Sequence, residues 1–248
     1  MVKLKNIVRF LNKELQVSKI KDFSKNGLQV RGTDEIKRIV FGVDACMELF
    51  EKAKQKNCDL IIVHHGLLWK NDKMDYLLKN RINFLKKNKI NLYAAHLPLD
   101  AHQKYGNNIQ LAELIGIKNP KKFCIYKGTK IGYYGELNLD LKDLIKLVNI
   151  KLKTKCLVHN FGRKKVNKIG VVSGRAADEI RQCLGIGVDT YITGEPVHEE
   201  YHTAKETKIN VLYAGHYATE TFGVKALMGL IREKFKIETV FIDIPTGM

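Results

Sequence analysis

The side chains best suited to chemistry in this chain are histidines and carboxylates that follow apolar runs. Apolar runs bounded in this way are typical of buried strands, and imidazoles and carboxylates gathered where strands end are ligands for divalent metals. A lone histidine at a strand end is more often a hydrogen-bonded structural residue, but a whole set of such residues favours a metal site. The set consists of His64, His65, His96, Asp100, His216 and Glu220.

Two of these strand ends repeat along the chain. The run Leu92-Tyr93-Ala94-Ala95-His96, followed by Asp100, returns 120 residues later as Leu212-Tyr213-Ala214-Gly215-His216, followed by Glu220. Residues 36–40 and 59–63 also have counterparts, at 166–170 and 189–193, in the same order. Each half therefore reads as helix, strand, strand, helix, strand, helix, strand. We predict an α/β fold of two duplicated, related α/β domains, 1–125 and 126–248, each of a size that buries its own core.

The spacing of the ligands favours two metal ions over one. Consecutive strand residues point to opposite faces, so His64 and His65 bind two neighbouring ions more comfortably than one. Pro98 is expected to keep Asp100 out of a helix interior and in a loop at the carboxyl end of the strand, where open α/β sheets place ligands. Glu220 is expected near the start of a helix over 219–235. We predict a dinuclear metal site in the cleft between the two domains, with carboxylates bridging the ions.

The positive charge is unevenly distributed. The formal net charge is +17, and residues 121–170 hold 13 basic and three acidic side chains. Such a concentration is typical of a surface that faces polyphosphate, although 35 of the 43 basic residues are lysine, and lysine-rich proteomes raise lysine everywhere. Lysine without interleaved aromatics favours phosphate contact over base reading. The candidate nucleic-acid contacts are Lys151, Lys153, Lys155, Arg163, Lys164, Lys165 and Lys168.

Composition sets the expected class and compartment. No apolar run approaches the roughly 18 residues of a membrane helix, and the N-terminus does not form a signal peptide. The five cysteines are scattered and form no Cys-x-x-Cys pair. We expect a soluble, cytoplasmic protein without a membrane partner, whose cysteines are buried thiols in a reducing compartment.

The quoted residues resemble the NGG-interacting-factor-three-like family, also known as GTP cyclohydrolase 1 type 2 homologues. The segment Asn26-Gly27-Leu28-Gln29-Val30 is similar to an N-terminal segment of that family, and 61–66, 96–100 and 215–220 match its ligand segments in order. The resemblance implies that two divalent ions per chain bind His64, His65, Asp100, His216 and Glu220. Mixed nitrogen and oxygen donors accept several metals, including zinc, manganese and iron. It also implies a supporting role for His96 and a toroidal homohexamer built as a trimer of dimers.

Two functions from different classes follow. In the first, the chain is a dinuclear-metal protein that binds single- and double-stranded DNA without sequence preference through its Lys-rich segment. In the alternative, it is a metal-dependent hydrolase of a nucleotide-like small molecule, with ring C–N hydrolysis of the GTP cyclohydrolase type, and Glu195 or His96 moves the proton. The backbone N–H groups of residues 173–175 are a further candidate for binding phosphate. The residues alone do not decide whether the chain is an enzyme.

Overall fold

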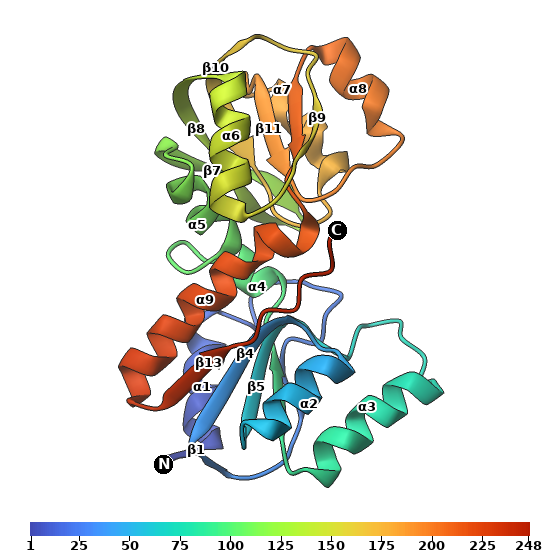
Figure 1. The fold of residues 1–248 in the computed structure, drawn as a ribbon, viewed down its shortest axis with the longest axis vertical. Coiled ribbons are helices and arrows are strands. Elements are labelled where there is room, and N and C mark those ends of the chain that lie inside the picture. Colours follow the sequence, from blue (N-terminus) through green and yellow to red (C-terminus); the bar gives the residue numbers. More distant parts are fainter. The chain divides into compact units, whose positions relative to one another are not determined.

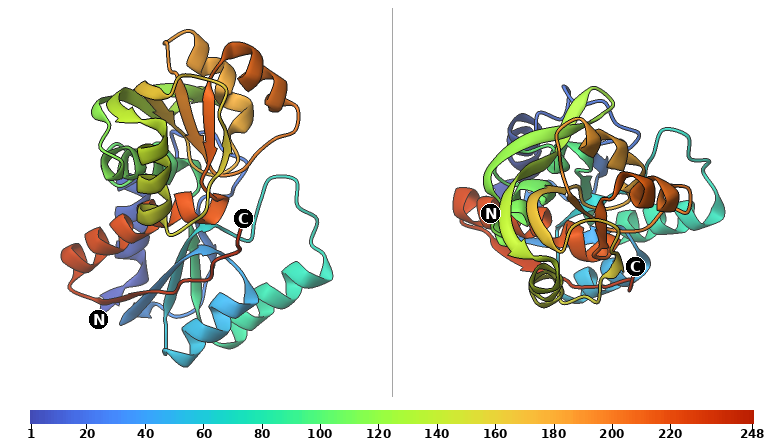
Figure 2. Two further views of the ribbon diagram at one scale, coloured as in Figure 1. Left: turned by 45° about the horizontal axis from the view of Figure 1, so that its top comes forward. Right: turned by 90° about the horizontal axis from the view of Figure 1, so that it is seen from above.

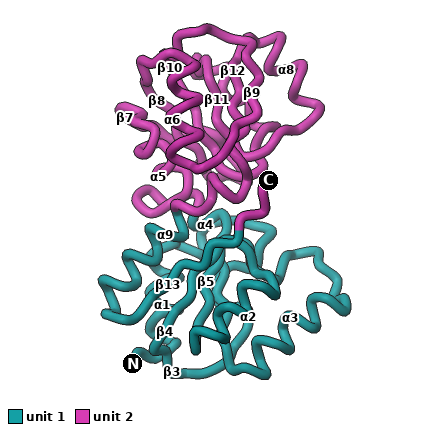
Figure 3. The backbone as a smooth tube through the Cα atoms, in the orientation of Figure 1, with its two compact units in different colours: residues 1–99, 223–244 teal, residues 100–222, 245–248 magenta.

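A computed structural model describes residues 1–248, which form two compact units (Figures 1 and 3). The first unit comprises residues 1–99 and 223–244, and the second comprises residues 100–222 and 245–248. The predicted boundary at residue 125 differs from this division. It falls inside strand β7 (Lys118–Tyr126), which pairs with the next strand of the second unit. No helix is both long and apolar enough to cross a membrane.

The first unit is built on a five-stranded sheet in the order β13-β4-β5-β6-β2. Its strands run parallel except β2, which pairs antiparallel with β6, and β1 and β3 form a separate two-stranded sheet. The strands are β1 (Val2–Lys3), β2 (Gly27–Val30), β3 (Glu35–Ile36), β4 (Arg38–Asp44), β5 (Leu60–His65), β6 (Asn91–Ala94) and β13 (Glu238–Phe241). The helices are α1 (Leu4–Glu14), α2 (Met47–Gln55), α3 (Tyr76–Lys87), all but the last residue of α4 (Leu97–Asp100), and the later part of α9 (His216–Phe235).

Both faces of this sheet are buried. Along β4, Ile39 and Phe41 belong to a core cluster with residues of α1 and α9, whereas Val40 belongs to a cluster with residues of α2 and α3. Figure 2 shows α2 and α3 together on one side of the strands. Because successive strand residues point to opposite faces, a strand covered on both sides needs an unbroken apolar run, as in residues 60–63.

The second unit has a six-stranded sheet in the order β7-β8-β10-β11-β12-β9. Only β10, β11 and β12 run parallel, and β8 and β9 flank them antiparallel. The remaining strands are β8 (Thr129–Asp140), β9 (Leu157–His159), β10 (Lys165–Val171), β11 (Thr190–Thr193) and β12 (Asn210–Tyr213). The helices are α5 (Asn107–Leu114), α6 (Leu141–Leu152), the 3-10 helix η1 (Ala177–Ile180), α7 (Arg181–Leu184), α8 (Glu200–Thr207) and the start of α9.

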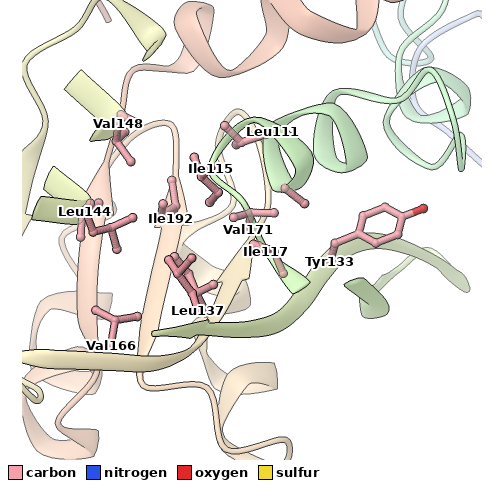
Figure 4. Packing of buried hydrophobic residues seen from close by; sticks show 14 of the residues in the cluster. Leu111, Ile115, Ile117, Tyr133, Leu137, Leu144, Val148, Val166, Val171 and Ile192 are labelled. Carbon is pink, nitrogen blue, oxygen red and sulfur yellow. The ribbon is translucent and has the colours of Figure 1, made fainter. Parts of the chain in front are cut away.

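One core of the second unit lies between helices α5 and α6 and the sheet. Leu111 of α5 and Leu144 and Val148 of α6 pack in the same cluster as Val171 and Ile192 of the central strands (Figure 4). Leu144 and Val148 stand four residues apart on α6, which is the spacing that buries one face of a helix against a sheet. This packing holds the loops at the carboxyl ends of the parallel strands on a rigid base.

The same polar contacts recur at the amino ends of the parallel strands in both units. Asp59 in the first unit accepts two consecutive backbone N–H groups at 2.7 and 3.1 Å, and Asp189 in the second does so at 2.9 and 3.1 Å. The buried side chains of Asn91 and Asn210 each accept a glycine N–H, at 2.8 and 2.7 Å. Each carboxylate or amide thus satisfies backbone groups that the ladders leave open.

The pairing of these strands gives an offset between the two units that differs by one residue from the 120-residue offset of the sequence repeat. Leu60 pairs with Asn91, and Thr190 pairs with Asn210, so the two asparagines correspond and stand 119 residues apart. His96 and His216 are 120 residues apart. The second unit therefore has one additional residue between the strand and its histidine. Since a shift of one residue moves a side chain to the other face of a strand, letter identity does not give equivalent positions here.

Candidate metal centre

Three histidines meet at the carboxyl edge of the first sheet. β5 ends with His64 and His65, and its parallel neighbour β6 leads through Ala95 to His96. Their ring centroids lie 4.6 to 5.5 Å apart, and one ligand nitrogen from each ring lies within 4.8 Å of the others. Alternation along a strand points consecutive side chains to opposite faces, but the rings of His64 and His65 have centroids only 4.6 Å apart at the end of β5.

An oxygen atom fixes the Nδ1 nitrogen of each of these rings. Nδ1 of His64 lies 2.9 Å from the carbonyl oxygen of Ala95, Nδ1 of His65 lies 2.7 Å from a carboxylate oxygen of Asp44, and Nδ1 of His96 lies 3.0 Å from Asp22. A carbonyl or carboxylate oxygen only accepts, so Nδ1 carries the proton and Nε2 of a neutral ring carries the lone pair. Metal-binding histidines in proteins have this arrangement, and the three residues therefore fit a divalent ion.

Asp22 is the most strongly held of these partners. Its side chain is 2 % exposed and accepts hydrogen bonds from His96, the amide of Asn26, and the backbone N–H groups of Ser24 and Leu97. Burial acts to raise the pKa of Asp22, but the contact with His96 and the other donors lower it to about 2. Asn26 also accepts the backbone N–H of His96 at 2.7 Å. Asp22 and Asn26 together fix both the ring and the backbone of His96.

Gln29 holds the loop that follows β5. Its side-chain oxygen accepts the backbone N–H groups of Leu67 and Leu68 at 2.7 and 3.1 Å. The loop carries Trp69, whose indole donates to the carbonyl oxygen of Gly66 and lies edge-on to His96 with ring centroids 5.0 Å apart. The segment that resembles a family motif, residues 26–30, therefore orients a histidine and an aromatic wall. Trp69 was not among the predicted site residues because no ligand spacing points to it.

In the second unit, His216 and Glu220 lie one turn apart at the start of α9. The helix begins at His216, three residues earlier than predicted. Nε2 of His216 lies 3.2 Å from a Glu220 carboxylate oxygen, and Nδ1 lies 3.3 Å from Glu195. Burial acts to lower the pKa of His216, but Glu220 and Glu195 raise it to about 9. Glu195 thus holds His216 much as Asp22 holds His96.

Asp100 is the last residue of α4, not a loop residue as predicted. Pro98 is the second residue of this one-turn helix, where the missing N–H of proline costs no helical hydrogen bond. The Asp100 carboxylate is buried, accepts the amide of Asn107 at 2.9 Å, and lies 3.4 Å from the hydroxyl of Ser173. A buried carboxylate has the donor chemistry expected of a metal ligand.

Two glycines make room for these carboxylates. Gly174 has a φ of +67°, and a Cβ there would overlap the Glu220 carboxylate. A Cβ on Gly194 would lie 2.6 Å from the Gly174 carbonyl oxygen and 2.7 Å from the Cα of His216. Both positions therefore require glycine for the second unit to place His216 and Glu220.

The predicted phosphate cradle at residues 173–175 is not available in this form. The backbone N–H of Ser173 donates to the side chain of Asn108 at 2.6 Å, and that of Gly174 donates to the hydroxyl of Thr219 at 3.0 Å. Both N–H groups therefore support the protein's own loop.

The predicted nucleic-acid contacts form two groups rather than one stripe. Lys151, Lys153 and Lys155 lie at the carboxyl end of α6, whereas the carbonyl oxygen of Lys164 accepts the N–H of Leu141 at its start. The 12 residues of α6 separate these ends by about 18 Å. Six of the seven residues are exposed and form no ion pair with an acid, and Lys168 donates to the carbonyl oxygen of Ile186.

Comparisons with known proteins agree with this fold. The model of the Duf34/NIF3 (NGG1p interacting factor 3) family matches residues 2–247. A protein of Archaeoglobus fulgidus named GTP cyclohydrolase 1 type 2 homolog is 44% identical over 248 residues, 99% of each chain, and a Pyrococcus horikoshii protein of the same name is 45% identical over 98% of each. Among solved structures, protein ybgI, described as of unknown function, is 34% identical with a TM-score of 0.94 over the full length of both chains. Residues 2–247 thus match one family throughout, and the chain belongs to the Duf34/NIF3 family.

Proposed function

We propose that this chain holds two divalent metal ions and uses them to hydrolyse a nucleotide or a related small molecule. The observation that carries the proposal is that an oxygen fixes Nδ1 of each histidine at the edge of the first sheet. Mixed imidazole and carboxylate donors suit zinc, iron or manganese. The proposed ligands of a dinuclear site in the cleft between the units are His64, His65, Asp100, His216 and Glu220.

The course of the chain supports a site that draws on both units. Asp100 belongs to the second unit and follows His96, a residue of the first, by four positions. Glu220 stands in the second unit on α9, and Val224, four residues later on the same helix, is buried in the core of the first.

The reaction that such a centre supports is attack of water on an electrophilic carbon or phosphorus. A pair of ions lowers the pKa of a bound water and polarises the bond under attack. Glu195, which lies beside His216, and His96 are the candidate groups for moving the proton from the attacking water to the leaving nitrogen or oxygen. Curated relatives bear the name GTP cyclohydrolase 1 type 2 homolog, so a nucleotide with a hydrolysable ring C–N bond is the first substrate to test.

The test is turnover of GTP by protein reconstituted with zinc, manganese or iron, followed by chromatography of the nucleotide. We expect metal-dependent loss of GTP that Glu220→Gln abolishes and that Glu195→Gln slows by about 10²–10⁴-fold. His198→Ala is the matched control, because His198 is an exposed histidine close to Glu195 in sequence. Equal turnover by the parent and the Glu220→Gln variant would assign the activity to a contaminant and contradict the proposal.

DNA binding is a second candidate function, supported by a specific observation. Six of the seven basic residues at 151–168 are exposed and have no acidic partner. Their charge is therefore not neutralised by ion pairs within the protein. Lysines of this kind bind phosphates of single- and double-stranded DNA through release of counterions, without reading sequence. Electrophoretic mobility shifts at about 100 mM salt test this directly, and the absence of any shift would leave the charge without this role.

We also propose that the two units descend from one ancestral α/β unit and that the chain assembles as a homohexamer, a trimer of dimers. The recurring contacts of Asp59 and Asp189 and of Asn91 and Asn210 support the duplication. The assembly rests on the family resemblance, and closed rings of identical chains are a common symmetric solution. Light scattering that gives a stable monomer at micromolar concentration would refute it.

A further inference from the structure

We propose that the second unit binds a nucleoside monophosphate in a cavity at the amino ends of its parallel strands β10, β11 and β12. The cavity has a volume of about 620 Å³, within the range of roughly 300–1,000 Å³ that is typical of small-molecule sites. Its lining belongs to the second unit alone and includes Phe161, Arg163, Lys168 and Lys208. The proposed hydrolysis involves none of these residues.

The lining of the cavity carries an excess of positive charge. Arg163 and Lys208 are exposed, and neither forms an ion pair with an acid. The acidic residue in the lining is Asp189, whose carboxylate already accepts two backbone N–H groups and a threonine hydroxyl. With Lys168, three cations and one carboxylate leave a net charge of +2. A phosphate monoester, which carries about −1.5 to −2 at pH 7, would balance that charge.

The first unit builds the same loop without an arginine. Asn91 holds residues 32–33 as Asn210 holds residues 162–163, through hydrogen bonds of 2.7 to 2.8 Å to the same backbone groups. The residue after the glycine is threonine in the first unit and Arg163 in the second. The loop therefore does not need the arginine in order to form, and its charge is free to serve a ligand.

A second pair of equivalent cations differs in the same way. Asp59 accepts the backbone N–H of Arg38, and Asp189 accepts that of Lys168, each at 3.1 Å. Arg38 forms an ion pair with Glu238 at 2.7 Å, whereas the Lys168 amine donates only to a carbonyl oxygen. Positive charge that the first unit balances internally is thus left open in the second, where an anion can bind.

Apolar side chains complete the lining and indicate what else the ligand contains. Phe161 is partly buried, and its ring lies edge-on to Tyr201 with centroids 5.2 Å apart. Leu184, Val188 and Ile209 line the same cavity, and Leu184 is 50% exposed. Inorganic phosphate or a sugar phosphate would leave these side chains uncovered. A planar base joined to the phosphate would cover them, because bases stack on aromatic side chains.

The experiment measures binding of AMP, adenosine and ribose 5-phosphate to the full-length protein by isothermal titration calorimetry at low ionic strength. The last two probes each lack one half of the proposed ligand. We expect AMP to bind at least about tenfold more tightly than either, since only AMP contacts both the cations and the apolar wall. AMP that binds no better than ribose 5-phosphate would contradict a site for the base.

Two sets of variants separate the two halves of the site. Arg163→Gln/Lys208→Gln should weaken AMP and ribose 5-phosphate alike, by at least about tenfold, because the phosphate loses two cations. Phe161→Leu should weaken AMP by about tenfold and leave ribose 5-phosphate unchanged. The control is Lys89→Gln/Lys205→Gln, which removes the same charge from exposed lysines outside the cavity and should bind AMP like the parent.

The outcomes distinguish this site from the proposed metal centre. AMP binding that Glu220→Gln abolishes and Arg163→Gln/Lys208→Gln leaves intact would belong to the metal centre, which would overturn this inference and not the proposed function. Parent protein that binds no AMP, or an equal loss of affinity in the control variant, would also overturn it. GTP turnover that fails its own test, in protein that binds AMP through Arg163 and Lys208, would overturn the proposed function alone.

Discussion

An imidazole is a dependable metal ligand only when its second nitrogen is held by an acceptor. The histidines of this chain were predictable because they follow apolar runs, but two of their acceptors were not. Asp44 stands 21 residues before His65, and Asp22 stands 74 residues before His96. Only the folded sheet brings these pairs together, so no local spacing in the sequence predicts them. The predicted ligands therefore required the structure to explain what orients them.

The glycines beside the second unit's carboxylates provide a test at the scale of one methyl group. Gly194→Ala places a Cβ against the Gly174 carbonyl and the His216 backbone, and we expect a loss of about 1–3 kcal/mol in the free energy of unfolding together with reduced metal content. Gly229→Ala on α9 is the matched control. Nothing lies within 4 Å of its new Cβ, and it should stabilise the helix by about 0.5–1 kcal/mol. Urea unfolding and metal analysis measure both effects, and unchanged values for Gly194→Ala would contradict the packing described.

At the scale of elements, the central parallel strands followed from their apolar runs, and the ends of elements did not. α9 begins at His216 and α4 contains Pro98 in its first turn, because end positions depend on which N–H groups need partners more than on periodicity. Alignment of the repeated residues also did not predict the one-residue difference in register between the units. A strand carries a period of two, so a repeat of similar apolar residues aligns almost equally well at either register.

The recurring asparagines at the strand starts provide a test at this scale. Asn91 and Asn210 are fully buried. Asn91 pairs with backbone groups of residues 32–33 and of Asp59, and Asn210 pairs with backbone groups of residues 162–163. Replacing either with alanine leaves those groups unpaired, and we expect each variant to lose about 2–4 kcal/mol in the free energy of unfolding. Asn88→Ala, which removes a single bond to the carbonyl oxygen of Phe84, should cost less than about 1 kcal/mol. Circular dichroism during urea unfolding reports on both units, and a negligible effect at Asn210 alone would argue against equivalent roles.

At the scale of the whole molecule, the fold class followed from the repeat, but the division of the chain did not. β13 returns from the end of the chain to pair with β4, with Glu238 opposite Arg38, and so joins residues 223–244 to the first unit. A pairing across some 200 residues depends on total burial and leaves no signal in a local window. The charged segment shows the same effect, since α6 separates lysines that are close in sequence.

Because α6 separates the two basic groups, the contribution of each group to DNA binding can be tested by itself. We expect Arg163→Gln/Lys164→Gln/Lys165→Gln and Lys151→Gln/Lys153→Gln/Lys155→Gln each to weaken binding and to lower the salt dependence of log K, by up to about 0.9 for each duplex phosphate that the variant no longer neutralises. The control is Lys70→Gln/Lys79→Gln/Lys86→Gln, which removes the same charge from exposed positions of the first unit. Fluorescence anisotropy at several salt concentrations measures the slopes. Equal slopes for all three variants would make net charge alone responsible.

The central claim is that the chain holds two divalent ions, and metal analysis tests it most directly. Purified protein is stripped with a chelator, reconstituted with zinc, manganese or iron, and separated from free metal before elemental analysis. We predict about two ions per chain for the parent and for His198→Ala, and a clear loss for Glu220→Ala, since Glu220 would be a ligand in the proposed site. Parent protein that retains no ion with any of the three metals would contradict the account.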